Sequence, residues 1–201
     1  MKQLEKQDYT YAIHLLCKAF KHNKSVLSVS RHSKRIPELM RYCLYTSALQ
    51  NLAFITDDKS AVVLCTKPQS IKPNLKQVLY QLRFILCGIG VFHIHTVLKR
   101  ESRIHAQHPT SPYIHLMFIG VDVSLQGQGI GSAMLTEIKE MAQATKLPIV
   151  LETSTTQNID FYVSNDFTLY TQEEIDGYML YFFIYPIIIN RLKSIIVILL
   201  M

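Results

Sequence analysis

Three glycines lie close together in the middle of the chain, between an apolar segment and an amphipathic one. Gly127, Gly129 and Gly131 follow the apolar run Leu116–Val121, which is typical of a buried strand. Directly after them, apolar residues recur with the period of an α-helix, at Ile130, Ala133, Met134, Ile138, Met141 and Ala142. A strand, a glycine loop and a helix in this order direct free backbone N–H groups and the positive end of the helix dipole toward one point. The segment therefore predicts a phosphate site, and the simpler alternative is a glycine turn.

The spacing excludes two common phosphate loops. A P-loop requires Gly-Lys-Ser/Thr after four spacer residues, and no lysine is present here. The dinucleotide fingerprint G-x-G-x-x-G is out of register by one residue, and no ribose-binding acid follows about 20 residues later. The pattern that fits is Q-x-x-G-x-G, formed by Gln126, Gly129 and Gly131.

A second set of polar and aromatic residues follows the predicted helix. Pro148 precedes a short apolar strand, Ile149–Leu151, which is followed directly by Glu152. Beyond it lies the pattern N-x-x-F-Y-x-x-x-x-F, which consists of Asn158, Phe161, Tyr162 and Phe167.

Together these motifs resemble the GCN5-related N-acetyltransferase (GNAT) superfamily, most closely its puromycin N-acetyltransferase-like branch, over about Tyr113 to Tyr170. The resemblance implies an α/β acyl-CoA N-acyltransferase (GNAT) fold, with a mixed, mostly antiparallel central sheet flanked by helices and splayed at Ile119–Val121. It also implies that acetyl-CoA is the co-substrate. The coenzyme-binding residues implied are Phe118, Ile119, Gly120, Val121, Gln126, Gly127, Gln128, Gly129, Ile130, Gly131, Ser132, Asn158 and Tyr162.

Acetyl transfer to an amine also requires an acid and a base. By resemblance, Tyr162 protonates the departing thiolate, and a phenol is reasonably matched to a thiol in pKa; the alternative is a core aromatic. Two candidates for the base remain open. Glu152 is expected at a strand end facing the cleft, or else is an exposed capping carboxylate. His115, on the central strand, has an ordinary pKa that suits a base, or else is a hydrogen-bonded core histidine.

Two departures from the puromycin-type branch bear on the acceptor. The branch more often carries His-Trp-Tyr where this chain has Tyr113-Ile114-His115, so the acceptor site is expected to differ. Asp166 replaces the usual glycine after the N-x-x-F-Y helix, and an aspartate can adopt the left-handed turn at modest cost.

The elements that position these residues follow from periodicity. Helices are expected at about Asp8–Lys21 and Ile36–Ala48, a loop at His22–Ser33, and a hairpin of strands Leu52–Thr56 and Ala61–Thr66. An inserted helical pair, Leu75–Gln107 broken at Gly88–Gly90, is expected to discriminate between acceptors. Strands Thr168–Thr171 and Gly177–Tyr185 close the domain, predicted as residues 1–188. An apolar tail, 189–201, has no assigned role.

Composition limits the other classes of partner. The chain is 49% apolar and 18% charged, with a net charge of +6 and no Lys/Arg run longer than two, so no nucleic-acid partner is expected. No uninterrupted apolar stretch reaches about 18 residues, so no membrane partner is expected either. Cys17, Cys43, Cys65 and Cys87 predict reduced core thiols in a cytoplasmic protein. The pairs His93/His95 and His105/His108 lack a carboxylate or cysteine to complete a set, so no metal is expected.

The sequence thus predicts acetyl transfer from acetyl-CoA to a primary amine of a small molecule, by direct attack in a ternary complex. Two alternatives remain open: a protein acetyltransferase that acts on a chain terminus or a lysine, and a non-catalytic CoA-binding module. A closed pocket walled by the Leu75–Gln107 insert would favour the small amine. The sequence does not identify the amine, and it leaves a homodimer open.

Overall fold

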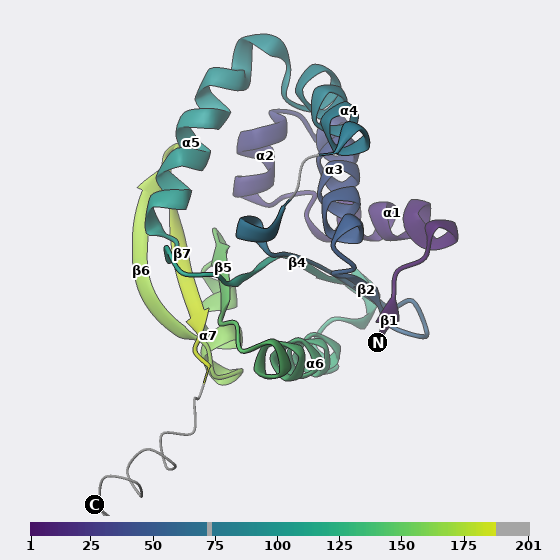
Figure 1. Cartoon of the computed structure of the whole chain (residues 1–201), viewed down its shortest axis with the longest axis vertical. Helices are drawn as coiled ribbons and strands as arrows, with labels where there is room; N and C mark the ends of the chain where they lie inside the picture. Colours follow the sequence, from purple (N-terminus) through teal and green to yellow (C-terminus); the bar gives the residue numbers. More distant parts are fainter. Residues whose placement is uncertain (72–73, 188–201) are drawn as a thin grey trace, which may run out of the picture.

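A computed structural model describes residues 1–71 and 74–187, which contain one twisted, mixed sheet (Figure 1). Its order is β1-β2-β3-β4-β5-β7-β6, and every neighbouring pair is antiparallel except β4 and β5. This is the mixed, mostly antiparallel sheet that the sequence predicted. The strands are β1 Lys2–Gln3, β2 Ala53–Ile55, β3 Ala61–Thr66, β4 Ile114–Val121, β5 Ile149–Thr153, β6 Thr168–Ile175 and β7 Tyr178–Tyr185.

Helices cover both faces of the sheet. Figure 1 shows α6 on one side of β4 and the group α1, α2 and α3 on the other, while α5 descends from α4 to the β6–β7 end. The α-helices are α1 Tyr9–Ala19, α2 Lys24–Ser30, α3 Ile36–Leu49, α4 Leu75–Arg83, α5 Ile94–Gln107, α6 Ile130–Thr145 and α7 Gln157–Ser164. Short 3-10 turns at Lys6–Asp8, Ser33–Arg35, Pro68–Ser70, Val91–His93 and Val123–Leu125 and a π-helical turn, Phe84–Ile89, connect them.

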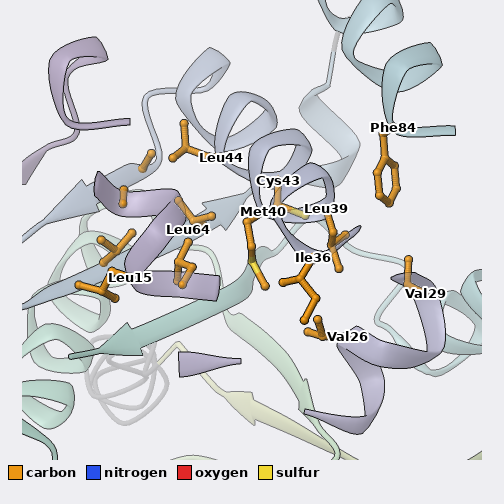
Figure 2. Close-up of a cluster of buried hydrophobic side chains, with 14 of the residues drawn as sticks. Leu15, Val26, Val29, Ile36, Leu39, Met40, Cys43, Leu44, Leu64 and Phe84 are labelled. Carbon is orange, nitrogen blue, oxygen red and sulfur yellow. The ribbon is translucent and has the colours of Figure 1, made fainter. Parts of the chain in front are cut away.

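Two apolar cores lie on opposite faces of the sheet. The first, in Figure 2, joins α1, α2 and α3 to β2 and β3 through side chains such as Leu15, Ile36, Met40 and Leu64, all buried. The second joins α6 and α7 to β3, β4, β5 and β7 and contains the buried Tyr162. Burial of this apolar area is the main force that fixes the helices on the sheet.

Strand β4 leaves its parallel neighbour early. It pairs with β5 only at Ile114 and His115, so the backbone from Leu116 onward has no partner on that side. The predicted splay at Ile119–Val121 is present and begins earlier in the strand. Opposite it, β3 pairs Leu64 with Phe118 but Cys65 with Leu116, which makes Met117 a bulge residue. The bulge bends β4 at the point where the two strands separate.

The insert between β3 and β4 forms two helical arms. Gly90, in a left-handed conformation with φ +87°, separates Leu75–Ile89 from Val91–Gln107, and the arms are bent by 90°. The nitrogen Nη1 of Arg35 donates to the carbonyl of Ile89 at 3.0 Å and holds this corner. Within residues 1–71 and 74–187 no single helix has the length and apolarity to cross a membrane, and this bent pair passes that test only when its arms are taken together.

Two predictions about local structure are wrong, and one is confirmed. The predicted loop His22–Ser33 contains α2, because Asn23 caps it by accepting from the N–H of Val26 at 3.0 Å and because Val26 and Val29 are buried. Cys87 is exposed and Cys17 only half-buried, so only Cys43 and Cys65 are core thiols. Asp166 does adopt the expected left-handed turn, with φ +67°. The predicted tail 189–201 lies outside the described residues.

Candidate active site

One cavity of about 920 Å³ runs from the glycine loop to the helical insert. We call the part lined by β4, the loop, α6 and α7 the loop end, and the part lined by α2, α3 and the insert the insert end. His115 and Glu152 line the wall between the two ends. The predicted residues that line the loop end are Phe118, Ile119, Val121, Gln126, Gly127, Gly129, Ile130, Gly131, Ser132, Asn158 and Tyr162.

Backbone geometry explains the glycines at the loop end. Gly127 and Gly129 have φ of +78° and +80°, a region that side chains disfavour, and a Cβ built on either would meet no atom within 4 Å. Gly131 is required for another reason, since a Cβ there would lie 3.2 Å from Cζ of Phe161. The first N–H groups of α6 have no partner inside the helix. The loop is therefore an open cradle of backbone donors, which suits a diphosphate.

Gly120 and Gln128 do not line the cavity. A Cβ on Gly120 would approach Cδ2 of Leu16 to 2.8 Å, so this glycine lets α1 pack closely behind β4. Gln128 lies between two left-handed glycines. The proposed coenzyme role of both residues remains a prediction, and for Gly120 the packing against α1 already explains the residue type.

Three side chains converge between the two ends. The carboxylate atom Oε2 of Glu152 lies 3.0 Å from Nε2 of His115 and 3.2 Å from Nε2 of His108. On its other side, Nδ1 of His108 lies 3.0 Å from the hydroxyl of Tyr113. An ionised carboxylate only accepts hydrogen bonds, so each Nε2 donates to it. The remaining ring nitrogen of His115, Nδ1, is then the one with a lone pair.

Electrostatics distinguish the two candidate bases. Burial alone would raise the pKa of Glu152, but the charge of His115 and the hydrogen bonds from both histidines hold it well below its usual range. Burial lowers the pKa of His115, yet the charge and hydrogen bond of Glu152 outweigh burial and raise it above its ordinary value. A carboxylate with a pKa this low, such as that of Glu152, is a poor proton acceptor. The arrangement therefore favours His115 as the base and Glu152 as the partner that orients it.

Tyr162 has a different environment. Its side chain is buried in the second core, against Phe167 and Phe183, while it also lines the cavity. Burial, with the charge of Glu152, raises the pKa of its phenol above the ordinary value. The phenol therefore stays protonated at neutral pH, and the raised pKa makes it a weaker acid toward a thiolate than an ordinary tyrosine. Asn158 lies nearby, where Nδ2 donates to Oγ1 of Thr153 at 3.3 Å.

His108 was missed as a site residue. Its spacing from His105 suggests a pair on one helix, but α5 ends at Gln107 and His108 is its C-cap. The chain reverses there, and Tyr113 follows after five residues. The signal in the sequence was a histidine at the end of the insert, just before the strand that carries His115.

The statement that no carboxylate completes a metal set is also wrong. The possible ligand atoms of His108, His115 and Glu152 all lie within 4.8 Å of one another. Among the described residues, these three form the cluster that could hold a metal ion. The same atoms form the hydrogen bonds described above. The absence of a bound metal at these three residues remains a prediction from the sequence.

The order of strands and helices is that of the acyl-CoA N-acyltransferase (GNAT) fold. Residues 89–169 match the family model of the acetyltransferase (GNAT) domain. Solved structures with the same fold cover nearly the whole chain at low sequence identity. A structure described as histone acetyltransferase HPA2 and related acetyltransferase, from Corynebacterium glutamicum, aligns with a TM-score of 0.64 at 15% identity, over 94% of this chain and 96% of that one.

Two further structures differ in their described substrates. Arylalkylamine N-acetyltransferase 2 from Aedes aegypti aligns with a TM-score of 0.63 at 13% identity, over 92% of this chain and 97% of that chain. The NatC complex bound to Gag peptide and CoA contains a chain that aligns with a TM-score of 0.55 at 12% identity, over 92% of this chain and 96% of that chain. At these identities the likeness establishes the fold, and the acceptor has to be argued from the cavity.

Proposed function

We propose that the protein transfers an acetyl group from acetyl-CoA to the primary amine of a small molecule whose body is apolar, by direct attack in a ternary complex. The observation that carries this proposal is the single cavity, which joins an anion cradle to a buried histidine–carboxylate pair and then to an apolar chamber. The matching GNAT domain, residues 89–169, supports acetyl-CoA as the donor.

The loop end has the features that a coenzyme requires. The open N–H groups at the start of α6 would bind the diphosphate, and Gly127 and Gly129 leave space for it. The free edge of β4 from Leu116 onward offers backbone groups to the pantetheine arm and to the thioester carbonyl. A donor directed at that oxygen is worth about 3–4 kcal/mol in comparable acyl-transfer sites.

The chemical steps balance with the residues at hand. Nδ1 of His115 takes a proton from the ammonium group, so that the amine attacks with a free lone pair. The new C–N bond forms as the C–S bond breaks, and Tyr162 gives its proton to the departing thiolate. The nitrogen, which carries one extra proton after the attack, then loses it to solvent, the Tyr162 phenolate regains a proton from solvent, and His115 releases the proton that it took. The products are an acetamide and CoA with a free thiol. The ionised Glu152 stabilises the imidazolium, while His108 and Tyr113 hold the carboxylate in position.

The insert end favours a small apolar acceptor over a peptide. Its walls come from α2, α3 and both arms of the insert, and its charged lining groups are few. Arg100 is buried and already bonded to the hydroxyls of Tyr178 and Ser25, and it pairs with Glu101. A wall that is mostly apolar satisfies few amides of a peptide. The polar lining residues at this end are Asn23, Ser25, Tyr42, Thr46, Thr66, Gln81, Arg100, Glu101 and His105. The apolar lining residues there are Val26, Val29, Leu39, Phe84, Ile85, Ile89, Ile94, Val97, Leu98 and Ile104.

A panel of acceptors tests the proposal directly. Thiol release from acetyl-CoA would be followed with an apolar amine such as phenethylamine, a polyamine such as spermidine, and short peptides with a free N-terminus. The proposal expects the highest kcat/KM for the apolar amine. Turnover mainly on peptides would establish the protein acetyltransferase instead, as the peptide-bound NatC neighbour suggests. Coenzyme binding without turnover on any amine would establish a non-catalytic module.

Chimeras locate the acceptor determinants. Exchange of residues 75–107 for the corresponding segment of another GNAT protein should change which amine is accepted and leave the KM for acetyl-CoA unchanged. If the exchange alters only thermal stability, the insert does not select the acceptor. The proposal that the insert selects the amine would then be abandoned. The inference of a small-molecule acceptor from the likeness to puromycin-type enzymes would be abandoned with it.

A further inference from the structure

The helical insert carries an unusual density of exposed apolar side chains. Fourteen large apolar residues among the described ones are exposed, and eight of these lie between residues 75 and 98. Phe92 is fully exposed, and Leu75 and Leu86 are 76% and 62% exposed. Contiguous apolar surface of this kind marks an interaction site in a soluble domain. The eight residues are Leu75, Val78, Leu79, Leu82, Leu86, Val91, Phe92 and Leu98; we call them the insert face.

Four of these residues share one side of α4. Leu75, Val78, Leu79 and Leu82 recur at i, i+3, i+4 and i+7, so they form a stripe along α4, which has no buried residue. Val91 and Phe92 follow Gly90 at the corner between the arms, and Figure 1 shows this corner at the end of the molecule farthest from α6 and α7. The insert face is therefore a projecting ridge, and no described element covers it.

Basic residues border the insert face. Three exposed leucines, Leu75, Leu82 and Leu98, are each followed directly by a cation: Lys76, Arg83 and Lys99. Neighbouring residues on a helix are about 100° apart, so each cation lies at the edge of the apolar stripe, where its long side chain can reach toward an anionic layer. Arg83 is paired with Glu38, at 2.9 Å and 3.0 Å. Exposed Arg31 and Lys34 add positive charge near the corner, because the turn Ser33–Arg35 contacts Phe84–Ile89.

This charge pattern argues against a second copy as the partner. Helix α4, LKQVLYQLR, contains two cations and no acid. A symmetric pairing of this face with itself would bring like charges together without acids on α4 to offset them. An amphipathic helix with an apolar face and a basic border is the form that binds an anionic lipid surface. Such binding needs no uninterrupted apolar run of about 18 residues, so the absence of a membrane-spanning stretch does not exclude it.

We propose that the insert face docks onto an anionic lipid surface. The helices would lie in the interface with their apolar stripe in the lipid and with Lys76 and Lys99 at the level of the head groups. Leu98 is 60% exposed and also lines the cavity. The docked surface is thus continuous with the insert end. Docking itself does not depend on the proposed acetyl transfer.

Vesicle flotation tests the docking surface without any substrate. The full chain should float with vesicles of phosphatidylcholine mixed with phosphatidylserine, and much less with phosphatidylcholine alone, and added salt should weaken the binding. Leu79→Gln and Leu82→Gln should each reduce partitioning by about tenfold. Leu49→Gln is the matched control, since Leu49 is 43% exposed, close to the 50% of Leu82, but lies at the end of α3. Neither Leu79 nor Leu82 lines the cavity, so acetyl-CoA binding reports whether each variant is folded.

A charge variant keeps the test decisive if a leucine variant does not fold. Lys76→Gln together with Lys99→Gln should reduce flotation with the anionic vesicles and leave the weak binding to phosphatidylcholine unchanged. The proposal is overturned by three results: no flotation of the wild type, equal binding to both vesicle types, or an equal loss in Leu49→Gln. It is also overturned if light scattering finds a wild-type dimer that Leu82→Gln converts to a monomer, because the face would then join two copies.

Discussion

The loop end and the insert end of the cavity differ in what lines them. At the loop end the backbone supplies most of the chemistry, through the N–H groups at the start of α6, two left-handed glycines and the free edge of β4. At the insert end, apolar side chains from α2, α3 and the insert line the wall. A backbone site requires particular residues at fixed spacing, whereas an apolar wall accepts many sequences of similar volume. This difference explains why a sequence motif identifies the loop end of the cavity but not the insert end.

The largest effect is expected from a charge placed in the backbone cradle. Gly129→Asp should abolish acetyl-CoA binding in calorimetry, because its carboxylate would face the diphosphate. Gly177→Asp is the matched control: Gly177 has a similar φ of +77° and similar open space, but lies between β6 and β7. The control should bind normally. Equal loss in both variants would mean that backbone strain, and not charge at the loop, is responsible.

The next largest effect is expected at the histidine between the two ends. His115→Gln should lower kcat by about 10²–10⁴-fold, the usual contribution of a general base, with the Kd for acetyl-CoA nearly unchanged. The control is His95→Gln, since His95 is exposed on α5 and does not line the cavity. A His115→Gln enzyme with wild-type kcat would show that the amine loses its proton elsewhere.

A smaller loss is expected at the phenol. Tyr162→Phe should lower kcat by about a hundredfold or less and leave coenzyme affinity intact, because only the proton for the thiolate is removed. Tyr185→Phe removes a hydroxyl that is bonded to Gln143 instead, and it should leave kcat unchanged. Steady-state kinetics decides the matter: full turnover in Tyr162→Phe would leave this residue as a core aromatic.

A shift of the pH profile is expected from the carboxylate partner. Glu152 raises the pKa of His115, and the base must be neutral, so kcat/KM should rise with pH through a pKa above the ordinary value for histidine. Glu152→Gln removes that influence and leaves burial, which lowers the pKa, so the acidic limb should move to lower pH. An unchanged limb in the variant would assign the titration to another group. In the wild type, the stability linked to the raised pKa of His115 is fully present below its unfolded pKa and is lost as pH rises through the raised pKa. The stability linked to the lowered pKa of Glu152 is present above its unfolded pKa and is lost as pH falls through the lowered pKa.

The smallest effect is expected from removal of metal. Dialysis against a chelator should leave kcat unchanged, because the proposed reaction uses His108, His115 and Glu152 as hydrogen-bonding partners only. Loss of activity that added Zn²⁺ restores would instead make this trio a metal site, which its spacing permits.

The sequence predicted those elements whose residue types are required by backbone geometry. The strand, the glycine loop and α6 lie where the motif places them, and Asp166 takes the turn usually made by glycine. Helix α2 was missed because it has only seven residues, too few for its period to stand out from a polar surrounding. Its cap, Asn23, was the available signal.

Contacts between distant residues could not be predicted in the same way. His108 reaches Glu152 across 44 positions, because α5 ends against the sheet and β5 runs beside β4. Neither spacing nor periodicity encodes such a meeting, which depends on where two elements finish in space. The insert face is a similar case: its period was visible, but only the structure shows that no described element covers it.

The position of His108 at the end of α5 has a practical consequence for redesign. The proposed acceptor chamber is lined by α5, and His108, which contacts the carboxylate of Glu152, is the C-cap of the same helix, so a graft that changes the length of α5 also moves this contact. A segment grafted to change the acceptor should therefore end at Gln107, and it should leave the residues from His108 to Tyr113 and their number unchanged. Libraries that vary only the inner face of the arms can search for new amines while chemical competence is maintained.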